Sequence, residues 1–433
     1  MSGNKYIAIA ILLLFCNHRG VTQRSFVTTH NGQFIQGGKP YYYIGANYWY
    51  ASLLANDKKG KERLKKELDF LVAKGVNNLR VLAGAEGEGL INGVKRVEPP
   101  LQSQKGKFNE DVLRSLDFLL VEMGKRRMKV ILFLSNNWEW SGGFLQYLNW
   151  NGLIEDSVLR RKLSWDEMRD YVKKFYSCES CKQDYYRQVE FVITRKNSIT
   201  GKKYTDDPAI MAWELANEPR PMRLSASKEY SEWISSAAAY IKSLDKNHLV
   251  TTGSEGEIGT ESMDLFKQVH ADKNIDYVTI HIWPKNWSWF SDTAIAKSMS
   301  TITGNTNNYI SKHASVVRTL NKPLVVEEFG LPRNNHSFSL SSPTSLRDEY
   351  YSGIFSSLYK SVKQGDIIAG VNFWALGGAG RPVQTWWSKG DDWLGDPPME
   401  EQGLNSVFDT DTSTWKVIYS FTQKIKKTDV GKK

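Results

Sequence analysis

The feature that most constrains the fold of this 433-residue chain is an alternation that repeats eight times. Each repeat is a short apolar or β-branched run followed by a longer amphipathic stretch. Parallel strands that are buried on both faces have continuous apolar sequences, and the helices that cover them have apolar residues with a 3.6-residue period. The alternation therefore predicts an α/β fold, a single (β/α)₈ TIM barrel with enlarged βα loops. The expected strands are 42–47, 76–82, 129–135, 210–215, 249–253, 277–281, 324–328 and 367–374.

Three further segments have predicted roles within this fold. Asn31-Gly32 lies between alternating residues before the first strand, which predicts an N-terminal β-hairpin that caps the bottom of the barrel. Residues 136–162 and 377–408 are long, aromatic and rich in glycine. Loops of that length in a compact domain are usually functional.

The N-terminus has the pattern of a secretory signal peptide. Lys5 precedes a short apolar run, and a polar stretch follows it within residues 1–23. Such a run is too short to span a bilayer, which takes about 20 residues. We therefore expect cleavage between residues 16 and 25, a single domain over 24–433, and a secreted, extracellular protein.

Cleavage would leave two cysteines, Cys178 and Cys181, in a C-x-x-C pair between helical patterns. In an oxidising compartment this pair predicts a small disulfide that clamps a loop. A redox centre would need a thioredoxin-like context, and a zinc site would need more ligands nearby. The sequons at Asn286 and Asn335 are candidate glycosylation sites.

The formal net charge of +10 does not indicate a nucleic-acid partner. The lysines and arginines are scattered through helical patterns, as on solvated helix faces, and no binding motif accompanies them. After the N-terminal segment, no stretch of the sequence is apolar enough for a membrane span. We expect a monomer that binds neither nucleic acid nor membranes.

Two glutamates stand in matching settings, Glu218 in W-E-L-A-N-E-P-R and Glu328 in K-P-L-V-V-E-E-F-G. Each follows an apolar run and precedes a chain-breaking Pro or Gly, so each is expected at the carboxyl end of a buried strand, where barrels keep their chemistry. Two facing carboxyl groups are the working parts of a retaining glycosidase. Glu218 suits the protonated acid and Glu328 the ionised nucleophile, and this chemistry needs no metal or cofactor.

Neighbouring residues would divide these two roles. Arg80, at the end of the second strand pattern, is the expected cation beside Glu328, although it could instead form a structural salt bridge at the barrel end. Glu327 should face away from the cleft by strand alternation, and Glu214 lies within its strand and is expected to be structural.

Aromatic residues close two further strands. His281 and Trp283 follow the sixth strand, and Trp374 closes the eighth. A ring at the top of the barrel can form the floor under a sugar, whereas one that faces outward only packs on a helix.

These motifs resemble glycoside hydrolase family five, in the clan of retaining (β/α)₈ hydrolases, from about Tyr41 to the C-terminus. The likeness rests on N-E-P, the terminal E-F-G strand, the strand-ending arginine, H-x-W and N-F-W. It implies that Glu218 is the acid/base and Glu328 the nucleophile. It implies the roles of active-site companions for Arg80, Asn217, His281 and Trp374.

Within that family the chain is most similar to endo-β-1,4-mannanases, especially invertebrate ones. The similarity lies in N-E-P-R, in N-N-W-E-W-S-G-G at 136–143 and in H-I-W-P-K-N-W at 281–287. It implies that Trp138 lies against the sugar chain and that Arg220 reaches the leaving-group side, with Asn137 and Trp283 also binding substrate.

The chain departs from the family at two places. Trp283 stands where many members carry a tyrosine that can bond the nucleophile. Asn136 and Asn137 stand at the third strand end, where many members have a histidine. An indole N–H can donate a hydrogen bond but cannot accept one as a phenol can.

The sequence thus predicts a secreted endo-β-1,4-mannanase that cleaves internal bonds of mannan, galactomannan or glucomannan by a retaining double displacement. An endo-β-1,4-glucanase of the same family is an alternative, because mannose and glucose differ only at C2. A non-catalytic barrel that binds polysaccharide is a second alternative, disfavoured because both carboxyl groups are present. A barrel enzyme for phosphorylated metabolites would need a Gly-rich phosphate loop after the seventh strand, which is missing.

Overall fold

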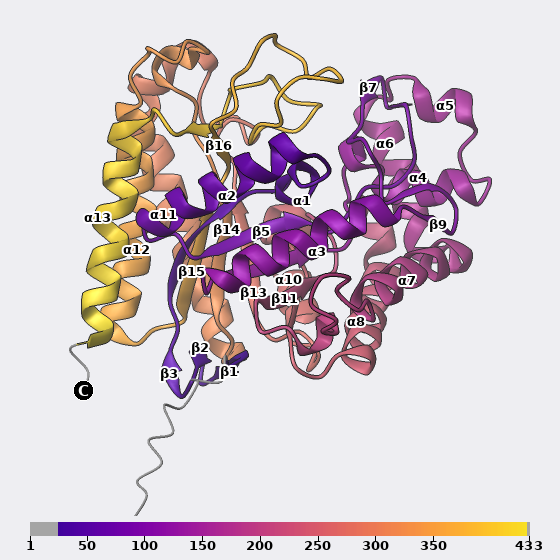
Figure 1. Ribbon diagram of the computed structural model, residues 1–433, viewed down its shortest axis with the longest axis horizontal. Coiled ribbons are helices and arrows are strands. Elements are labelled where there is room, and N and C mark those ends of the chain that lie inside the picture. Colours follow the sequence, from indigo (N-terminus) through magenta and orange to yellow (C-terminus); the bar gives the residue numbers. More distant parts are fainter. Residues whose placement is uncertain (1–24, 431–433) are drawn as a thin grey trace, which may run out of the picture.

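The computed structural model describes residues 25–430 and contains a barrel of eight parallel strands surrounded by helices (Figure 1). The predicted signal peptide lies outside the described residues. Every barrel strand is buried along its whole length, which is why each reads as a continuous apolar run. The predicted strands are confirmed, with ends that differ by one or two residues. They are β4 (Tyr43–Asn47), β5 (Asn78–Leu82), β10 (Lys129–Phe133), β11 (Ile210–Glu214), β12 (Leu249–Thr251), β13 (Val278–Ile282), β14 (Leu324–Phe329) and β15 (Ile368–Phe373).

The strands pair in the order β12-β11-β10-β5-β4-β15-β14-β13. Between β12 and β13, the two ends of this order, individual hydrogen bonds replace a regular ladder. Asp276 donates its backbone N–H to the carbonyl of Val250 over 2.8 Å, and Thr251 donates its hydroxyl to the carbonyl of Tyr277 over 3.0 Å. These bonds bring the open edges together, so the barrel is nearly closed.

Several of the helices that follow the strands have capping residues at their ends. Asp57 and Asn109 accept hydrogen bonds from the first turns of α2 and α3, and Gly365 adopts a left-handed conformation just after α12. No helix in the range 25–430 combines the length and the apolar character needed to cross a bilayer. The helices are α1 (Ala51–Leu54), α2 (Lys58–Ala73), α3 (Glu110–Lys125), α4 (Gly143–Trp150), α5 (Asp156–Arg160), α6 (Trp165–Val172), α7 (Glu179–Ile193), α8 (Ser227–Leu244), α9 (Glu257–Thr260), α10 (Met263–His270), α11 (Ile295–Leu320), α12 (Ser345–Gln364) and α13 (Thr412–Val430).

The predicted N-terminal hairpin is present and lies at the lower end of the barrel in Figure 1. It consists of β1 (Val27–His30) and β2 (Gln33–Gln36), extended by β3 (Lys39–Pro40). Phe34 of β2 contacts the rings of Tyr43 and Tyr277, with ring centres 6.3 and 5.2 Å away. The hairpin therefore covers the bottom of the barrel, and access to the interior is left to the opposite end.

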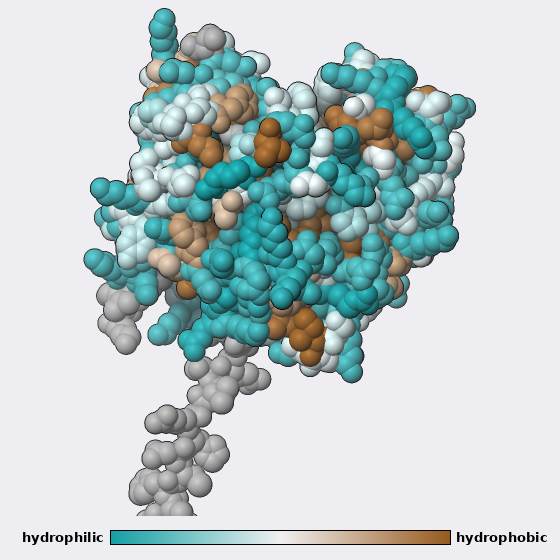
Figure 2. Space-filling model, turned by 45° about the horizontal axis from the view of Figure 1, so that its top comes forward, coloured by the Kyte–Doolittle hydropathy of each residue, from teal (hydrophilic) through white to brown (hydrophobic). Residues whose placement is uncertain are grey.

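The enlarged loops gather at that opposite end. Residues 136–162, expected to be a loop, contain the short helices α4 and α5, and residues 377–408 form a long irregular segment. In Figure 1 these two regions rise on opposite sides of the barrel, and Figure 2 shows a notch in the upper edge between them. Short strand pairs complete the loops: β6 (Leu90–Ile91), β7 (Val94–Lys95), β8 (Gln102–Gln104), β9 (Lys107–Phe108), β16 (Leu376–Gly378) and β17 (Val407–Phe408).

Candidate active site

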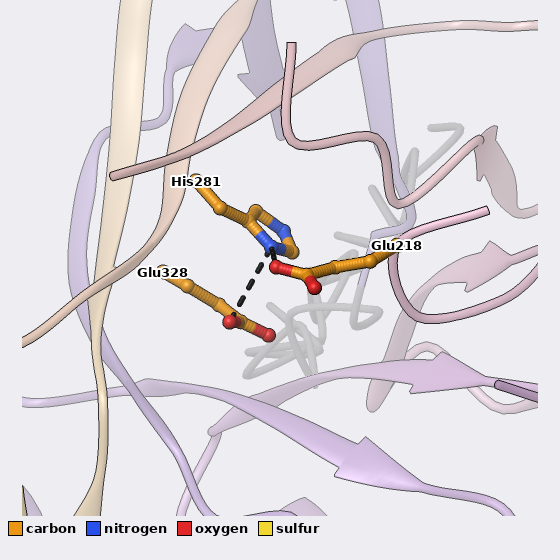
Figure 3. A group of neighbouring side chains, drawn as sticks. All are labelled: Glu218, His281 and Glu328. Carbon is orange, nitrogen blue, oxygen red and sulfur yellow. Dashed lines mark hydrogen bonds and ion pairs between the residues drawn. The ribbon is translucent and has the colours of Figure 1, made fainter. Parts of the chain in front are cut away.

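The two predicted acids come together at the top of the barrel, at the carboxyl ends of their strands. Glu328 lies near the end of β14, and Glu218 follows β11 with φ of 51°, a left-handed conformation that is rare outside glycine. One side-chain oxygen of each acid and one ring nitrogen of His281 all lie within 4.8 Å of one another (Figure 3). Backbone strain of this kind is typical of residues held for function.

His281 bridges the two acids. Its Nδ1 lies 2.7 Å from Oε1 of Glu218 and 3.3 Å from Oε2 of Glu328 (Figure 3). Burial alone would lower the pKa of His281, but the charge of Glu328 and hydrogen bonds to the carboxylates raise it well above its ordinary value. His281 is therefore a cation at neutral pH and donates its Nδ1 proton to Glu218.

This bridge also sets the ionisation of Glu218. Burial acts to raise the pKa of Glu218, yet the hydrogen bond and charge of His281, helped by Arg220 and the indole of Trp138, hold that pKa below its ordinary value. In the protein without sugar, the proton that Glu218 would need as an acid thus lies on His281.

Arg80 fulfils both predicted roles at once. It is fully buried and donates through Nη1 to Oε1 of Glu328 over 2.5 Å and through Nη2 to Asn217 over 2.7 Å. Its Nε and Nη2 also bond both oxygens of Glu214, at 2.8 and 2.5 Å. Glu327 lies 3.6 Å from Arg80, close enough for charge attraction but too far for a hydrogen bond.

Alternation alone therefore does not separate Glu327 from Glu328. Both side chains approach Arg80, and the pairing of β13 with β14 shifts by one residue between Ile280 and His281. What distinguishes them is access, because Glu328 is the one that lines the cavity.

Each acid also accepts a hydrogen bond from an indole. Trp283 donates from Nε1 to Oε2 of Glu328 over 3.1 Å, and Trp138 donates from Nε1 to Oε2 of Glu218 over 2.5 Å. Trp374 is nearly buried and meets the ring of Trp283 edge-on, with centres 5.8 Å apart. The tryptophan at position 283 thus donates the hydrogen bond that its indole chemistry allows.

Asn136 occupies the third strand end, where many family members have a histidine. Its Oδ1 accepts hydrogen bonds from the backbone N–H of Trp138 over 3.0 Å and from Nδ2 of Asn217 over 3.1 Å. Asn136 therefore orients two residues that adjoin Glu218.

Arg220 and Asn137 stand at the side of Glu218. Arg220 forms a two-pronged ion pair with Glu255, at 2.5 and 2.6 Å, and its guanidinium lies over the ring of Trp138 at 4.9 Å. Asn137 is buried behind this pair and accepts a hydrogen bond from the backbone N–H of Arg220 over 3.4 Å. Asn137 therefore adjoins Arg220 and does not line the cavity, and its contact with the substrate stays a prediction.

A cavity of about 510 Å³ contains both acids. Its lining residues form two groups from different parts of the chain, one after β10, β11 and β12, the other in or after β13, β14 and β15. The first group holds Trp138, Trp140, Trp165, Asn217, Glu218, Arg220, Glu255 and Ile258, and the second holds Trp283, Asn286, Trp287, Glu328, Trp374, Met399 and Glu400.

The sequence did not identify several of these lining residues, among them Trp140, Trp165, Glu255, Met399 and Glu400. Trp140 and Trp165 follow the third strand within or just beyond its aromatic loop, but ring count alone does not select individual residues. Burial, with the charges of Asp396 and both catalytic candidates, raises the pKa of Glu400 well above its ordinary value. These surroundings therefore favour the protonated, uncharged form of the Glu400 carboxyl group.

The remaining predicted sites lie at the surface or to one side. Cys178 and Cys181 are joined in a disulfide where α7 begins, with their Cα atoms 5.2 Å apart. Asn286 lines the exposed edge of the cavity, and Asn335 is exposed after β14. Glycosylation at these two positions stays a prediction.

The group formed by Glu218, His281 and Glu328 offers three donor atoms to a metal ion. Metal ligation requires a neutral histidine, however, and His281 carries a proton between two carboxylates. Arg80 already neutralises Glu328. The charges in place therefore disfavour a cation, and the arrangement suits proton transfer and nucleophilic attack.

Comparisons with known proteins agree with this geometry. A family model described as "GH family 5 beta-mannosidase-like" matches residues 24–430. Mannan endo-1,4-β-mannosidase 1 of Arabidopsis thaliana is 30% identical over 390 residues, which cover 86% of this chain and 84% of the relative.

Solved structures are similar over almost the whole chain. A variant of the glycoside hydrolase family 5 mannosidase from Rhizomucor miehei, in complex with mannosyl-fructose, is 31% identical with a TM-score of 0.85, covering 94% of this chain and 98% of that one. The endo-1,4-β-mannanase from Rhizomucor miehei is 24% identical with a TM-score of 0.67, covering 93% and 100%, and shares the fold.

Proposed function

The chain belongs to the β-mannosidase-like proteins of glycoside hydrolase family 5, and from this we propose that it hydrolyses β-1,4-mannosidic bonds with retention of configuration. The observation that carries the proposal is the spacing of the acids, because one oxygen of Glu218 and one of Glu328 lie within 4.8 Å. Retaining enzymes hold their carboxyl groups about 5–5.5 Å apart, and inverting enzymes need roughly 6.5–9.5 Å to admit a water.

In the first step Glu328 attacks the anomeric carbon while Glu218 protonates the leaving oxygen. Arg80 and the indole of Trp283 each donate a hydrogen bond to the carboxyl group of Glu328 and hold it in position. A bound sugar expels water, which disfavours the charged pair of His281 and Glu218 and moves the proton across the 2.7 Å hydrogen bond to Glu218. In the second step Glu218 takes a proton from the water that releases the sugar from Glu328.

Substitution of the two acids tests these roles. Glu328→Ala should abolish hydrolysis of soluble mannan because no nucleophile remains, and Glu218→Gln should do so because an amide cannot deliver the proton. Both proteins should keep the circular dichroism spectrum of the folded chain. Glu232→Gln, at a side chain that is 64% exposed on α8, is the control and should keep full activity. Activity in either acid variant would refute the assignment.

The proposed substrate is the β-1,4-linked mannan backbone, including galactomannan and glucomannan, cut at internal bonds by a secreted enzyme. The curated relative is a mannan endo-1,4-β-mannosidase. The signal-peptide pattern at residues 1–23 supports secretion. Reducing-sugar assays on galactomannan, glucomannan and carboxymethylcellulose should give the largest signal on a mannan, and a dominant signal on carboxymethylcellulose would favour the glucanase alternative.

Removal of single mannose units from a chain end is a second candidate function. The matching family model is described as β-mannosidase-like, and the similar fungal structure is a mannosidase. Met399 and Glu400, from the long loop after β16, line the cavity, and a loop that closes one end of the site would favour cleavage at chain ends. Mannohexaose distinguishes the two: internal cleavage first gives a mixture of shorter oligosaccharides, whereas chain-end cleavage first gives mannose and mannopentaose.

A further inference from the structure

Trp165 is an exposed aromatic residue at the Glu218 side of the cavity. Its side chain is 52% exposed at the start of α6, yet it lines the same cavity as Glu218. Trp386, on the opposite lobe, is similarly exposed at 55% but lies outside the set of described residues that line this cavity. A large apolar ring in water beside a catalytic group is a candidate contact surface for a ligand.

The ring of Trp165 continues an aromatic surface that begins at the acid. Its centre lies 6.2 Å from the ring of Trp138, and the two planes differ by 27°. Trp138 is itself hydrogen-bonded to Glu218, the residue that protonates the leaving oxygen. The two rings therefore lie on the leaving-group side of the bond that is cut.

Three cross-links fix α6 to the loops that follow β11 and β12. Arg169 donates from Nε to the carbonyl of Met222 over 2.5 Å and pairs with Glu261 at 2.7 Å. Arg223 pairs with Asp166, next to Trp165, at 2.8 Å.

The N-terminus of α6 is also capped by its own residues, because Ser164 and Glu167 form a reciprocal capping box. Trp165 is therefore held in place relative to Glu218 before any ligand arrives. Such preorganisation lowers the entropic cost of binding.

We infer that Trp165 is the stacking platform for a further mannosyl unit of the substrate chain, beyond the unit that Trp138 and Arg220 contact on the leaving-group side. A pyranose has an apolar C–H face that matches an indole ring and hydroxyl groups at its rim that stay in water. An exposed ring in a cavity that also holds carboxyl and guanidinium groups suits such a unit better than a wholly apolar ligand. The inference rests on the proposed function and adds a binding site to it.

The experiment compares substrates with short and long leaving groups. We would measure kcat/KM on 4-nitrophenyl β-mannoside and on mannopentaose for the wild type, Trp165→Ala, Trp165→Phe and the matched control Trp386→Ala. We expect Trp165→Ala to lose roughly tenfold in kcat/KM on mannopentaose, mainly through KM, which corresponds to about 1.4 kcal/mol. The loss on the aryl mannoside should be much smaller, and Trp165→Phe should recover most of the activity.

Three outcomes would overturn the inference. They are equal losses on both substrates, an unchanged kcat/KM of Trp165→Ala on mannopentaose, or the same loss in Trp386→Ala. A wild type that cleaves neither substrate would instead refute the proposed function, and this inference with it. Thermal denaturation of each variant shows whether a loss comes from unfolding, which is not expected because Trp165 is exposed.

Discussion

At the scale of residues, the site is a set of charges that share protons. His281 contacts both Glu218 and Glu328, and Arg80 contacts Glu214, Glu328 and, at longer range, Glu327. Burial raises the pKa of Glu214 to about 8 although the charge of Arg80 opposes it. Groups coupled this closely titrate together, so the pH dependence of activity belongs to the cluster and not to one acid.

Arg80 is the residue on which this cluster depends most. Arg80→Lys keeps one positive charge but loses the planar fork that bonds Glu214, Asn217 and Glu328 together. We expect kcat/KM on mannan to fall at least a hundredfold. The free energy of unfolding should fall by about 3–5 kcal/mol, because buried carboxyl groups lose their partners. Urea denaturation and mannan hydrolysis measure the two effects, and a variant with wild-type activity would contradict this role.

The sequence was informative about residues wherever a motif ties a side chain to a strand. Glu218 and Glu328 could be predicted because each closes an apolar run. Arg80 and His281 could be predicted because each is a polar residue in an apolar strand, Arg80 in the middle of β5 and His281 near the end of β13. Glu255, Glu400 and Trp165 could not be predicted as site residues. Their positions depend on the path of loops whose course the sequence does not determine.

At the scale of elements, burial decides what could be predicted. The barrel strands are fully buried, so their apolar runs gave boundaries within one or two residues. Helix α4 was missed because Gly142 precedes it and Gly143 begins it, both with positive φ. Its aromatic residues also contact several neighbouring elements, which masks a helical period. The gap in pairing beside β12 was likewise invisible, since a break in pairing leaves no mark on hydrophobicity.

Two buried histidines on neighbouring helices predict a loss of stability in acid. His270 in α10 donates a hydrogen bond from Nδ1 to the carbonyl of Phe266 and accepts one at Nε2 from the hydroxyl of Thr252. His313 in α11 likewise donates from Nδ1 to the carbonyl of Tyr309 and accepts at Nε2 from the backbone N–H of Glu257. Burial lowers the pKa of His270 to about 3 and that of His313 to about 4. Both are therefore neutral in the folded protein, and protonation would remove an acceptor.

The direction of this pH dependence follows from which state of the chain takes up protons. Between the folded pKa values and about 6.5, the unfolded chain binds protons at these histidines that the folded chain does not, so stability falls as pH falls through this range. For His313 the cost reaches about 3 kcal/mol near pH 4, because each pKa unit corresponds to about 1.4 kcal/mol.

Urea denaturation at pH 7, 5.5 and 4.5 measures this loss. In His313→Gln, which cannot be protonated, the free energy of unfolding should start lower at pH 7 but fall less steeply. Equal slopes for the variant and the wild type would contradict a neutral, buried His313.

At the scale of the whole molecule, the barrel supplies a rigid base and the loops supply the walls of the cleft. Loops after β10 and α6 build one lobe, and the long segment between β16 and β17 builds the other, on either side of the notch in Figure 2. The barrel class followed from the repeat count, because eight alternating units have few other arrangements. The depth and length of the cleft could not be predicted from the sequence, since they depend on how two loops far apart in the chain are arranged.

The lobe that carries Met399 and Glu400 is fastened to the barrel by a buried ionic clamp. Asp411, just before α13, accepts hydrogen bonds from Arg333 and, at 3.4 Å, from Arg347. Arg347 also donates to the carbonyls of Leu331 and Ser406 over 2.7 and 3.1 Å. The clamp therefore joins the loop after β14, helix α12 and the end of the long segment.

Loss of the charge on Asp411 should destabilise the whole molecule. Asp411→Asn would leave two buried guanidinium groups without their anion, and such a loss costs about 3–5 kcal/mol. The matched control is Asp409→Asn, whose partner Arg381 is 36% exposed and whose own side chain is 39% exposed, so that exposed pair contributes at most about 1 kcal/mol. Urea denaturation of both variants measures the difference. Mannan hydrolysis should fail at a lower urea concentration in Asp411→Asn, because the clamp holds the segment that lines part of the cavity. Equal stability of the two variants would show that the clamp does not hold this lobe.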